Sequence, residues 1–584
     1  MKIIEPKQSA TALEITRKRY LMTDAKGKVI ETPGEMLWRV SQHMAKPEAL
    51  WSDNGAVHEA AEAFYKSMIA KKFVCSGKAM FEAGNPGGSG QLAACFVLPI
   101  SDSIDSIFKT LGEAAVIHKN NGGTGFNFSK IRPHGDKVKN VPKAASGPVD
   151  FIKAFSAALS KILQGAKRQG ANIAIVNADH PDIEDFIKMK IEDGTVKNFN
   201  VSVGVTDKFM QAVKAKKPWS LINPRTQETV RTVRADRLFR LICELAWQTA
   251  DPGMAFLDRM EQDNPTPTLG KLEATNPCGE IPLLPYESCN LGSINLALHV
   301  KNNQVDWDKL KTTVHLGVRF LDNMVEVNNF PLDEIRRLVK DGNRRIGLGV
   351  MGLAHLFFKL GIAYNSEAAV KLSEKLAKFI REEADKATEK LGKTRGNFGN
   401  YDVSIYADSN QPRRNCATTM IAPTGTISMF ADCSSGIEPV FALTTKRKTF
   451  FEDDRANKPT KEMIIEDPVY RQYKNKYGQK VFVTAHEIGW QWHVMMQAAW
   501  QKYFDNSVSK TINLSHTATV DDVGQAYMLA WKLGCKGTTV YRDGSKQDQV
   551  LNKSAEICPE CSHDLEFKEG CWHCGHCVYS RCSL

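Results

Sequence analysis

Helix-like and strand-like segments alternate along most of this chain, and this alternation limits the possible folds more than any other feature. Apolar residues at helical spacing predict helices over residues 151–163, 236–250, 306–327, 367–391 and 487–504. Short runs typical of strands lie at residues 93–100, 202–206 and 345–350. Such alternation predicts an α/β fold, of which a barrel is one form.

The two ends of the chain differ from this alternating region. Helical spacing predicts helices at Glu35–Met44 and Glu59–Met68, and the glycine-rich run Gly84–Gly90 ends this part. After Ser545 the sequence becomes polar, as in a flexible linker, and a cysteine-rich segment follows. The predicted organisation is a mostly helical domain, an α/β domain, a linker and a cysteine-rich tail, over residues 1–90, 91–542, 543–557 and 558–584.

Composition excludes several classes of protein. With 42% hydrophobic and 24% charged residues the chain is globular rather than disordered. It has no apolar run long enough to span a membrane and no apolar stretch of a secretory signal at its start, so we expect a cytoplasmic protein. The net charge of +11 suits an anionic ligand such as a nucleotide. Spread over 584 residues, it does not indicate a nucleic-acid-binding surface.

The segment Asn276–Pro282 has the composition of a reactive loop. Its prolines and its glycine exclude a regular helix and predict an extended or turning chain. In an extended chain Asn276, Cys278 and Glu280 would project to one side at intervals of about 6–7 Å. An amide, a thiol and a carboxylate together can bind, form a radical or nucleophile, and transfer protons. The alternative is a buried turn in which Cys278 only packs.

Two further cysteines are candidates to lie near Cys278. Cys95 sits in an apolar, strand-like run, and Cys289 follows eleven residues after Cys278. Two thiols can deliver two electrons and close to a disulfide if their Cα atoms lie within about 7 Å. The alternative, which spacing alone favours, is a pair of unrelated core thiols.

The segment Ile421–Ser428 is a candidate anion site. Small hydroxyl residues and a glycine after a proline suit the start of a helix, whose free N–H groups favour a phosphate. An ordinary capped helix start has the same composition. Gly122–Gly125 is similarly rich in glycine but lacks the spacing of a dinucleotide fingerprint.

The tail contains six of the fourteen cysteines. Cys558 and Cys561 form one C-x2-C pair, and Cys574 and Cys577 form another after twelve intervening residues, as in a zinc ribbon. Cys571 with Cys574 is a second way to complete the metal site. Whichever pair stays outside the metal is free to cycle between dithiol and disulfide.

Several motifs, in order along residues 12–584, resemble the ribonucleotide reductases and most closely the adenosylcobalamin-dependent class II enzymes. They are ETPGEMLWRV, GQLAACFVLPISDSIDSI, GGTGFNFSKIRP, NPCGEIPL with ESCNLGSINL, RNCATTMIAPTGTIS with SSGIEPVFAL, WHVMMQAAWQKYFDNSVSKTINL and KGTTVYRDGS. The resemblance implies reduction of ribonucleoside di- or triphosphates to deoxyribonucleotides for DNA synthesis. It also implies a ten-stranded α/β barrel with the radical cysteine on a loop inside it.

Roles at the reacting centre follow from the same resemblance. Cys278 would carry the thiyl radical, Glu280 would accept the 3′-hydroxyl proton, and Asn276 would bind the substrate hydroxyls. Cys95 and Cys289 would be the reducing dithiol. The residues expected at the substrate are Ala94, Cys95, Gly123, Asn276, Pro277, Cys278, Gly279, Glu280, Pro423, Thr424, Gly425, Thr426 and Ile427.

The resemblance also implies regulation and a reductant. Asp102, Ser103 and Ile104 would receive a deoxynucleotide or ATP specificity effector at a homodimer interface, and Lys167–Asn177 would relay its identity. Cys577 and Cys582 would carry electrons from thioredoxin or a glutaredoxin-like protein. That choice leaves zinc to Cys558, Cys561, Cys571 and Cys574.

The source of the radical follows from motifs that are missing. The chain has no Tyr-Tyr pair of the class I kind, only Tyr541 in TTVYRDGS, and no glycyl-radical motif of class III. Adenosylcobalamin is therefore the expected cofactor. Two departures are notable: Ala79 replaces a hydroxyl that contacts substrate in many relatives, and an N-terminal ATP-binding module is not expected. The competing functions are a class I-like large subunit that needs a radical-generating partner, and a zinc-ribbon protein that binds nucleic acid.

Overall fold

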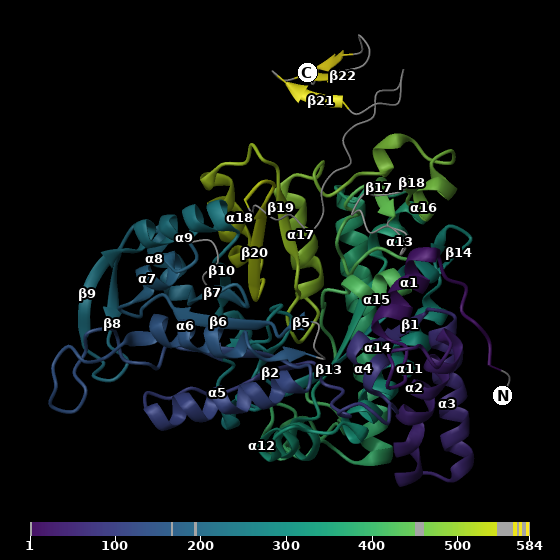
Figure 1. Cartoon of the computed structure of the whole chain (residues 1–584), viewed down its shortest axis with the longest axis horizontal. Helices are drawn as coiled ribbons and strands as arrows, with labels where there is room; N and C mark the ends of the chain where they lie inside the picture. The colour runs from purple at the N-terminus through teal and green to yellow at the C-terminus, as the bar shows by residue number, and fades with distance from the viewer. Residues whose placement is uncertain are drawn as a thin grey trace.

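The computed structural model describes residues 3–164, 168–191, 196–449, 461–545, 565–568, 571–574 and 580–582. The N-terminal part is helical, with α1 (Ala10–Arg19), α2 (Pro33–Ala45), η1 (Lys46–Leu50) and α3 (Asn54–Ile69) at one side of the molecule (Figure 1). Helix α2 begins with a capping box, in which Thr32 and Glu35 satisfy each other's backbone N–H groups. The prediction of helices at 35–44 and 59–68 is confirmed.

The first ninety residues also supply one strand and one short helix to the rest of the molecule. Strand β1 (Phe73–Cys75) pairs antiparallel with β13 (Ser288–Asn295), and α4 (Gly77–Glu82) follows it directly. Buried ion pairs tie the helical layer to the α/β part: Glu48 accepts from Arg319 at 2.8 Å and from Arg395 at 2.7 Å. The charged contact of the N-terminal layer is therefore made with two helices, α11 (Trp307–Val327) and α14 (Glu367–Arg395).

Ten strands form the central sheet, and its middle is parallel. Strands β2 (Cys95–Val97), β3 (Gly123–Asn127), β6 (Asn172–Asn177), β7 (Phe199–Val205) and β10 (Gly253–Phe256) run parallel in this order. Antiparallel contacts flank them, from β2 to β13 and from β10 to β20 (Gly537–Arg542). Beyond these, β16 (Ile346–Met351) lies parallel to β13, and β19 (Thr511–Leu514) lies parallel to β20.

The expected closed barrel is not seen among the described residues. The ladder is open between β16 and β19, and only isolated bridges, Leu348 to Thr419 and Ile421 to Val508, cross the gap. The reason is local. The backbone N–H groups of Thr418 and Thr419 donate to the carboxylate of Asp505, at 2.8 and 2.7 Å, instead of to a neighbouring strand. These donors are satisfied without a continuous ladder.

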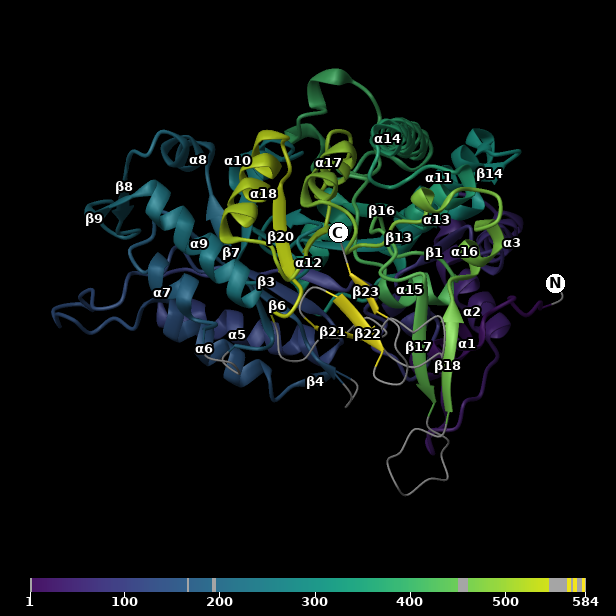
Figure 2. The ribbon, with the colours of Figure 1, turned by 90° about the horizontal axis from the view of Figure 1, so that it is seen from above.

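Helices cover the sheet, as the alternating sequence predicts. They are α5 (Ile104–Lys119), α6 (Gly147–Leu159), α7 (Ile183–Lys188), α8 (Asp207–Lys214), α9 (Ala235–Thr249), α10 (Leu257–Gln262), α11 (Trp307–Val327), α12 (Asp333–Arg336), α13 (Leu353–Leu360), α14 (Glu367–Arg395), α15 (Gly425–Phe430), α16 (Pro468–Tyr473), α17 (Trp490–Gln501) and α18 (Val520–Lys532). Seen from above, α17 and α18 lie beside β20, and α14 borders the opposite half (Figure 2). In the described part of the chain, no helix has the length and apolar character needed to cross a membrane.

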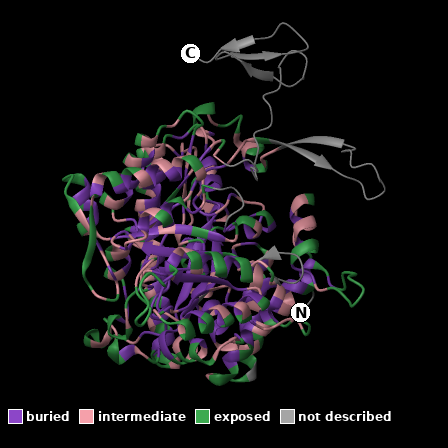
Figure 3. Cartoon of the chain, turned by 60° about the vertical axis from the view of Figure 1, so that its left-hand side comes forward, coloured by how far each residue is buried: buried purple, intermediate pink, exposed green. Residues whose placement is uncertain are grey.

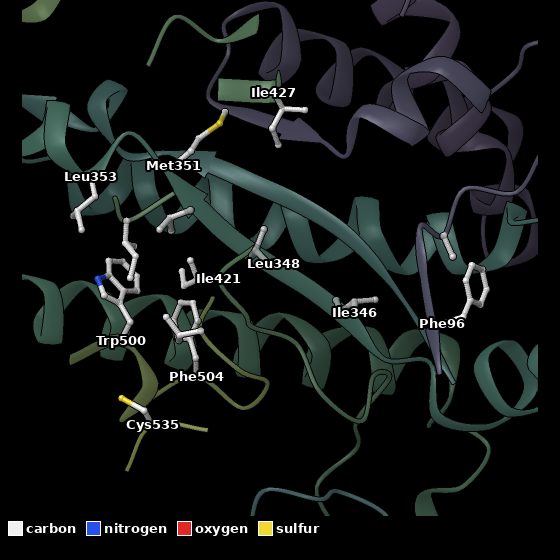
Figure 4. Packing of buried hydrophobic residues seen from close by; sticks show 14 of the residues in the cluster. Phe96, Ile346, Leu348, Met351, Leu353, Ile421, Ile427, Trp500, Phe504 and Cys535 are labelled. Atoms are coloured by element: carbon white, nitrogen blue, oxygen red, sulfur yellow. The ribbon is translucent and has the colours of Figure 1, made fainter. Parts of the chain in front are cut away.

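The core lies between the sheet and these helices. Buried residues fill the centre of the molecule and exposed ones form its rim (Figure 3). Close to the open edge, Ile346 and Leu348 of β16 belong to the same buried hydrophobic cluster as Ile421, Trp500 and Phe504 (Figure 4). This packing holds the two edges of the sheet together where the ladder is interrupted.

The structure also contains smaller sheets of two or three strands, separate from the ten-stranded sheet. They pair β4 (Leu163–Gln164) with β5 (Arg168–Gln169), β8 (Pro218–Ile222) with β9 (Thr229–Arg234), β11 (Ala274–Thr275) with β12 (Pro282–Leu283), β14 (Val300–Lys301) with β15 (Gln304–Val305), β17 (Thr444–Thr449) with β18 (Lys461–Glu466), and β21 (Leu565–Lys568) with β22 (Cys571–Cys574) and β23 (Ser580–Cys582). Of these, the β11–β12 hairpin matters most, because it carries the loop with Cys278.

Candidate functional site

The loop from Asn276 to Ile281 is a tight hairpin turn rather than the extended chain considered above. The backbone N–H of Asn276 donates to the Ile281 carbonyl at 3.2 Å, and the Asn276 side-chain oxygen accepts from the Ile281 N–H at 3.1 Å. Gly279 takes the left-handed conformation (φ 79°) that the turn needs. The turn, and not alternation along an extended strand, therefore determines where Asn276, Cys278 and Glu280 lie.

This turn separates the three side chains by exposure. Asn276 and Glu280 are buried, whereas Cys278 is exposed and lines a cavity of about 310 Å³. Two outside contacts hold the loop: Asn200 donates to the Pro277 carbonyl at 2.6 Å, and the Ser507 N–H donates to the Glu280 carbonyl at 2.8 Å. A thiol on a loop fixed from both sides is preorganised for a reaction in that cavity.

Glu280 has the electrostatics of a proton-transfer group. Burial raises the pKa of its carboxyl to about 7, and the hydrogen bond from Asn276 opposes this only in part. Its Oε2 atom is buried and has no hydrogen-bond partner among the described residues. A carboxyl that titrates near neutrality, with one oxygen not engaged by the protein, can take up a proton from a bound molecule.

Cys95 lies against the same loop. The Asn276 side-chain amide donates to the Cys95 sulfur at 3.4 Å. Burial, together with the nearby Glu280, raises the pKa of the Cys95 thiol to about 12, so it is protonated at neutral pH. Cys95 and Cys289 are direct register partners on β2 and β13. Partners in an antiparallel pair have Cα atoms about 4.5–5.5 Å apart, which a disulfide can span.

Gly123 explains how the loop approaches the sheet so closely. It is the register partner of Cys95 on β3, and its N–H donates to the Ala94 carbonyl at 2.7 Å. A Cβ atom at this position would lie 3.1 Å from the Pro277 ring and 3.0 Å from the Ala171 carbonyl oxygen. The structure thus brings Ala94, Cys95, Gly123 and the Cys278 loop into one site.

A second, smaller cavity of about 110 Å³ lies beside the first, and Pro423 lines both. Its lining is Ser76, Gly77, Leu291, Gly292, Ser293, Ala422, Pro423, Thr424, Gly425, Thr426 and Ile427. Thr424 does not cap α15 with its side chain, because its hydroxyl oxygen accepts from the Gly436 N–H at 2.7 Å. The first N–H groups of α15 are thus left uncapped at the cavity, which suits an anion.

Ser76 and Gly77 are cavity residues that the sequence analysis did not single out. In this segment only Ala79 was noted, as the replacement of a hydroxyl residue, and it is fully buried in α4. Ser76 is the N-cap of that helix and accepts from the Ala79 N–H at 3.3 Å. A serine–glycine pair directly before a predicted helix start is the signal that could have identified them.

The expected effector residues lie at the start of α5. Asp102 accepts from the backbone and the guanidinium of Arg132 and forms an ion pair with it at 2.8 Å. Ser103 caps α5, and Ile104 is 61% exposed. Arg132 is a partner that the sequence pattern did not indicate. Lys167 lies outside the described residues, and Asn172–Asn177 forms strand β6, so the expected relay segment is in part a sheet strand.

The cysteine-rich tail lies only in part within the described residues. Cys558, Cys561 and Cys577 lie outside the described residues, and the structure gives the backbone of Cys571, Cys574 and Cys582. In the described part, no group of three or more metal-binding side chains is assembled. Positions 571 and 582 are register partners on β22 and β23. This places two of the tail cysteines at a distance that a disulfide can span.

Comparison with known proteins gives consistent matches along the chain. Residues 6–88 match the family model described as ribonucleotide reductase, all-alpha domain, and residues 93–413 and 409–541 match ribonucleotide reductase, barrel domain. A protein of Thermoplasma acidophilum named vitamin B12-dependent ribonucleoside-diphosphate reductase is 41% identical over 93% of this chain and 80% of its own length. A protein of Mycobacterium tuberculosis (strain H37Rv) with the same name is 41% identical over 97% of this chain and 82% of its own. The vitamin B12-dependent ribonucleotide reductase of Streptomyces avermitilis is 28% identical over 85% of this chain and 60% of its own length.

Proposed function

This chain belongs to the class II branch of the ribonucleotide reductase family and reduces ribonucleotides, and we propose that its substrates are ribonucleoside diphosphates and its radical source is adenosylcobalamin. The diphosphate assignment follows the names of the relatives that are 41% identical. The observation that carries the proposal is the fixed Cys278 loop, with Asn276 bonded to Cys95 and with a buried Glu280 whose pKa is about 7.

Each of these residues receives one role. Cys278 takes the 3′ hydrogen atom of the ribose, Glu280 accepts the proton of the 3′-hydroxyl, and Asn276 binds the hydroxyls. Cys95 and Cys289 supply two electrons and two protons, so that the 2′-hydroxyl leaves as water and the two sulfurs join in a disulfide. At the end of the reaction the hydrogen atom returns to the 3′ carbon and the Cys278 radical is restored.

The cavity at Cys278 suits the nucleoside part of the cofactor. Its volume of about 310 Å³ and its hydroxyl-rich lining, which includes Ser202, Ser509, Thr511 and Tyr541, fit an adenosyl group. When bound, the cofactor supplies the organic radical that generates the thiyl radical at Cys278. The protein's part is to hold the Cys278 thiol at the cavity.

The phosphates of the substrate belong in the second cavity. The first residues of α15, whose N–H groups have no side-chain cap, line that cavity together with Thr424, and Pro423 lines both this cavity and the Cys278 site. This arrangement supports the expected contacts of Pro423 to Ile427 with the phosphates.

Effector control and dimer formation are assigned to α5. Asp102, Ser103 and Ile104 would bind a deoxynucleotide or ATP effector at its first turn. The apolar side chains of Ile104, Phe108 and Val116 are 61%, 57% and 41% exposed. An exposed apolar helix face of this kind is typical of an interface, which supports the proposal of a homodimer.

The experiment that tests the function uses the purified full chain alone. With dithiothreitol, cytidine diphosphate and adenosylcobalamin, we expect deoxycytidine diphosphate, and none when the cofactor is omitted. Activity that needs no cobalamin, or that requires a second protein, would contradict the assignment to class II and favour the class I-like alternative. Salt-dependent binding of nucleic acid without any turnover would favour the zinc-ribbon alternative.

The reducing dithiol makes a prediction about stoichiometry. Without dithiothreitol, the reduced wild-type enzyme should form product only until its own thiols are oxidised. The variants Cys95→Ser and Cys289→Ser should each give less than a tenth of the wild-type product yield. Thiol titration after the reaction should show a loss of two thiols per turnover. Cys535→Ser, which alters a buried thiol that does not line the cavity, is the control. Full single-turnover yield from Cys95→Ser would refute the role.

The tail is expected to bind zinc and to carry electrons to the Cys95–Cys289 pair. We propose Cys558, Cys561, Cys571 and Cys574 as zinc ligands, with Cys577 and Cys582 as the shuttle pair that thioredoxin or a glutaredoxin-like protein reduces. The register of β22 and β23 favours a second assignment, in which Cys571 and Cys582 form the shuttle pair.

Two variants separate these assignments. Cys571→Ser should lower bound zinc from about one ion per chain to nearly none under the first assignment, but leave it unchanged under the second. Cys577→Ser should do the reverse. In both, activity with dithiothreitol should persist, because the small thiol reaches the active-site disulfide directly. Zinc retained by both variants would exclude both ligand sets.

A further inference from the structure

Tyr20 lies behind the smaller cavity and contacts two of its lining residues. This buried tyrosine, 3% exposed, ends helix α1, and its hydroxyl donates to the Thr426 hydroxyl oxygen at 2.6 Å. A Cβ atom on Gly77 would lie 2.9 Å from the Tyr20 ring, so the absence of a side chain at Gly77 makes room for it. Thr426 and Gly77 both line the cavity.

Helix α1 packs against α15, and the two helices lie next to each other in Figure 1. At one end, the Ser9 hydroxyl and N–H donate to Asp432, at 2.5 and 3.2 Å, and Lys71 pairs with the same carboxylate at 2.6 Å. At the other end, the Tyr20 ring packs edge-on against Phe430, with centroids 6.4 Å apart. Tyr20 is therefore held in place independently of any ligand in the cavity.

The hydrogen bond gives the Thr426 hydroxyl a direction. A hydroxyl has one proton to donate, and a phosphate oxygen can only accept. Because Tyr20 donates to the Thr426 oxygen, the Thr426 proton is left for another acceptor, and Thr426 lines the cavity where an anion could accept it. Burial raises the pKa of Tyr20 to about 12, so the phenol remains a donor at neutral pH. A donor whose orientation is set in advance binds an anion without the cost of reorienting.

We propose that Tyr20 is a positioning residue for the substrate phosphates, which acts by orienting the Thr426 hydroxyl toward them. The N-terminal helical layer thereby contributes to substrate affinity from outside the α/β domain. The inference rests on the proposed function, since it takes the smaller cavity as the phosphate site.

The test compares Tyr20→Phe with Tyr65→Phe. Tyr65 is an equally buried tyrosine of the same layer, whose hydroxyl donates to the Ile4 carbonyl at 2.9 Å, away from the cavity. For cytidine diphosphate we expect Tyr20→Phe to raise KM about fivefold to tenfold with kcat within twofold of wild type, and Tyr65→Phe to leave both unchanged. Calorimetric titration with cytidine diphosphate should show the same loss of affinity.

A double-mutant cycle tests whether Tyr20 acts through the Thr426 hydroxyl. Thr426→Val should raise KM by itself, and adding Tyr20→Phe to it should have no further effect, because the hydroxyl that Tyr20 orients is gone. Additive effects of the two changes, an unchanged KM in Tyr20→Phe, or equal shifts in Tyr20→Phe and Tyr65→Phe would each overturn the inference. If the wild-type protein failed to turn over, the proposed function would fall, and the calorimetric comparison would still decide the role of Tyr20.

Discussion

Replacing Cys278 by serine is expected to reduce the rate of deoxynucleotide formation by about a thousandfold or more while leaving substrate affinity within about twofold. A serine O–H bond is much stronger than a thiol S–H bond, so no radical that can attack the ribose forms at this position. The substitution is nearly isosteric, and Cys278 is exposed in its cavity, so the loop should keep its shape. The measurement is single-turnover product formation together with calorimetric binding of cytidine diphosphate.

The matched control for Cys278→Ser is Cys243→Ala. Cys243 is buried on α9 and does not line the cavity at Cys278. We expect its substitution to lower thermal stability and to leave kcat within about twofold. If Cys278→Ser retained more than about a tenth of wild-type turnover, the assignment of the radical to this thiol would be wrong, whatever the behaviour of the control.

Glu280→Gln is expected to lower kcat by about a hundredfold to ten-thousandfold, the range for loss of a general base. In the wild type, the carboxylate is the form that accepts the proton, and the pKa of Glu280 is raised by burial to about 7. The wild-type rate should therefore rise as the pH increases through about 7 and level off above it. In Glu280→Gln this rise should disappear, since glutamine does not titrate. Rates measured from pH 5.5 to 8.5 test this.

The same pKa has an opposite consequence for stability. The ordinary value for this carboxyl is 4.5, so the folded state holds the proton more tightly than the unfolded state does. Folding stability should fall as the pH rises from about 4.5 to about 7, because the buried carboxylate is disfavoured. At about 1.4 kcal/mol per pKa unit the loss amounts to a few kcal/mol. Glu280→Gln should thus unfold at a higher temperature than wild type at pH 8 and at a similar one at pH 4.5.

Glu383→Gln provides the control for the carboxylate. Glu383 is buried on α14, pairs with Lys386 at 2.7 Å and with His315 at 2.8 Å, and does not line the cavity at Cys278. Its substitution should leave the pH–rate profile unchanged. A wild-type-like pH profile in Glu280→Gln would mean that another group accepts the 3′-hydroxyl proton.

The fold class was predictable because its signals are local. Helical spacing at residues 236–250 and 367–391 matches α9 and α14 to within a few residues, since amphipathic periodicity is written into consecutive residues. The break at Gly84–Gly90 and the residue types of the Asn276–Pro282 loop were readable for the same reason. Whether the sheet closes into a barrel was not predictable from the sequence. It depends on whether the backbone N–H groups of Thr418 and Thr419 donate to a strand or to Asp505, which is more than eighty residues away in the sequence.

The candidate site was likewise predictable in its residue types but not in their three-dimensional arrangement. The sequence alone identified Cys278, Glu280 and Asn276 as chemically capable residues, and the order of motifs led to the family. Only the tertiary structure decided that a turn buries Glu280 and raises its pKa, that positions 95 and 289 are register partners on adjacent strands, and that Tyr20 reaches Thr426 from another layer. Burial, register and contacts between distant segments arise from the packing of the whole chain, and no local pattern of residues specifies them.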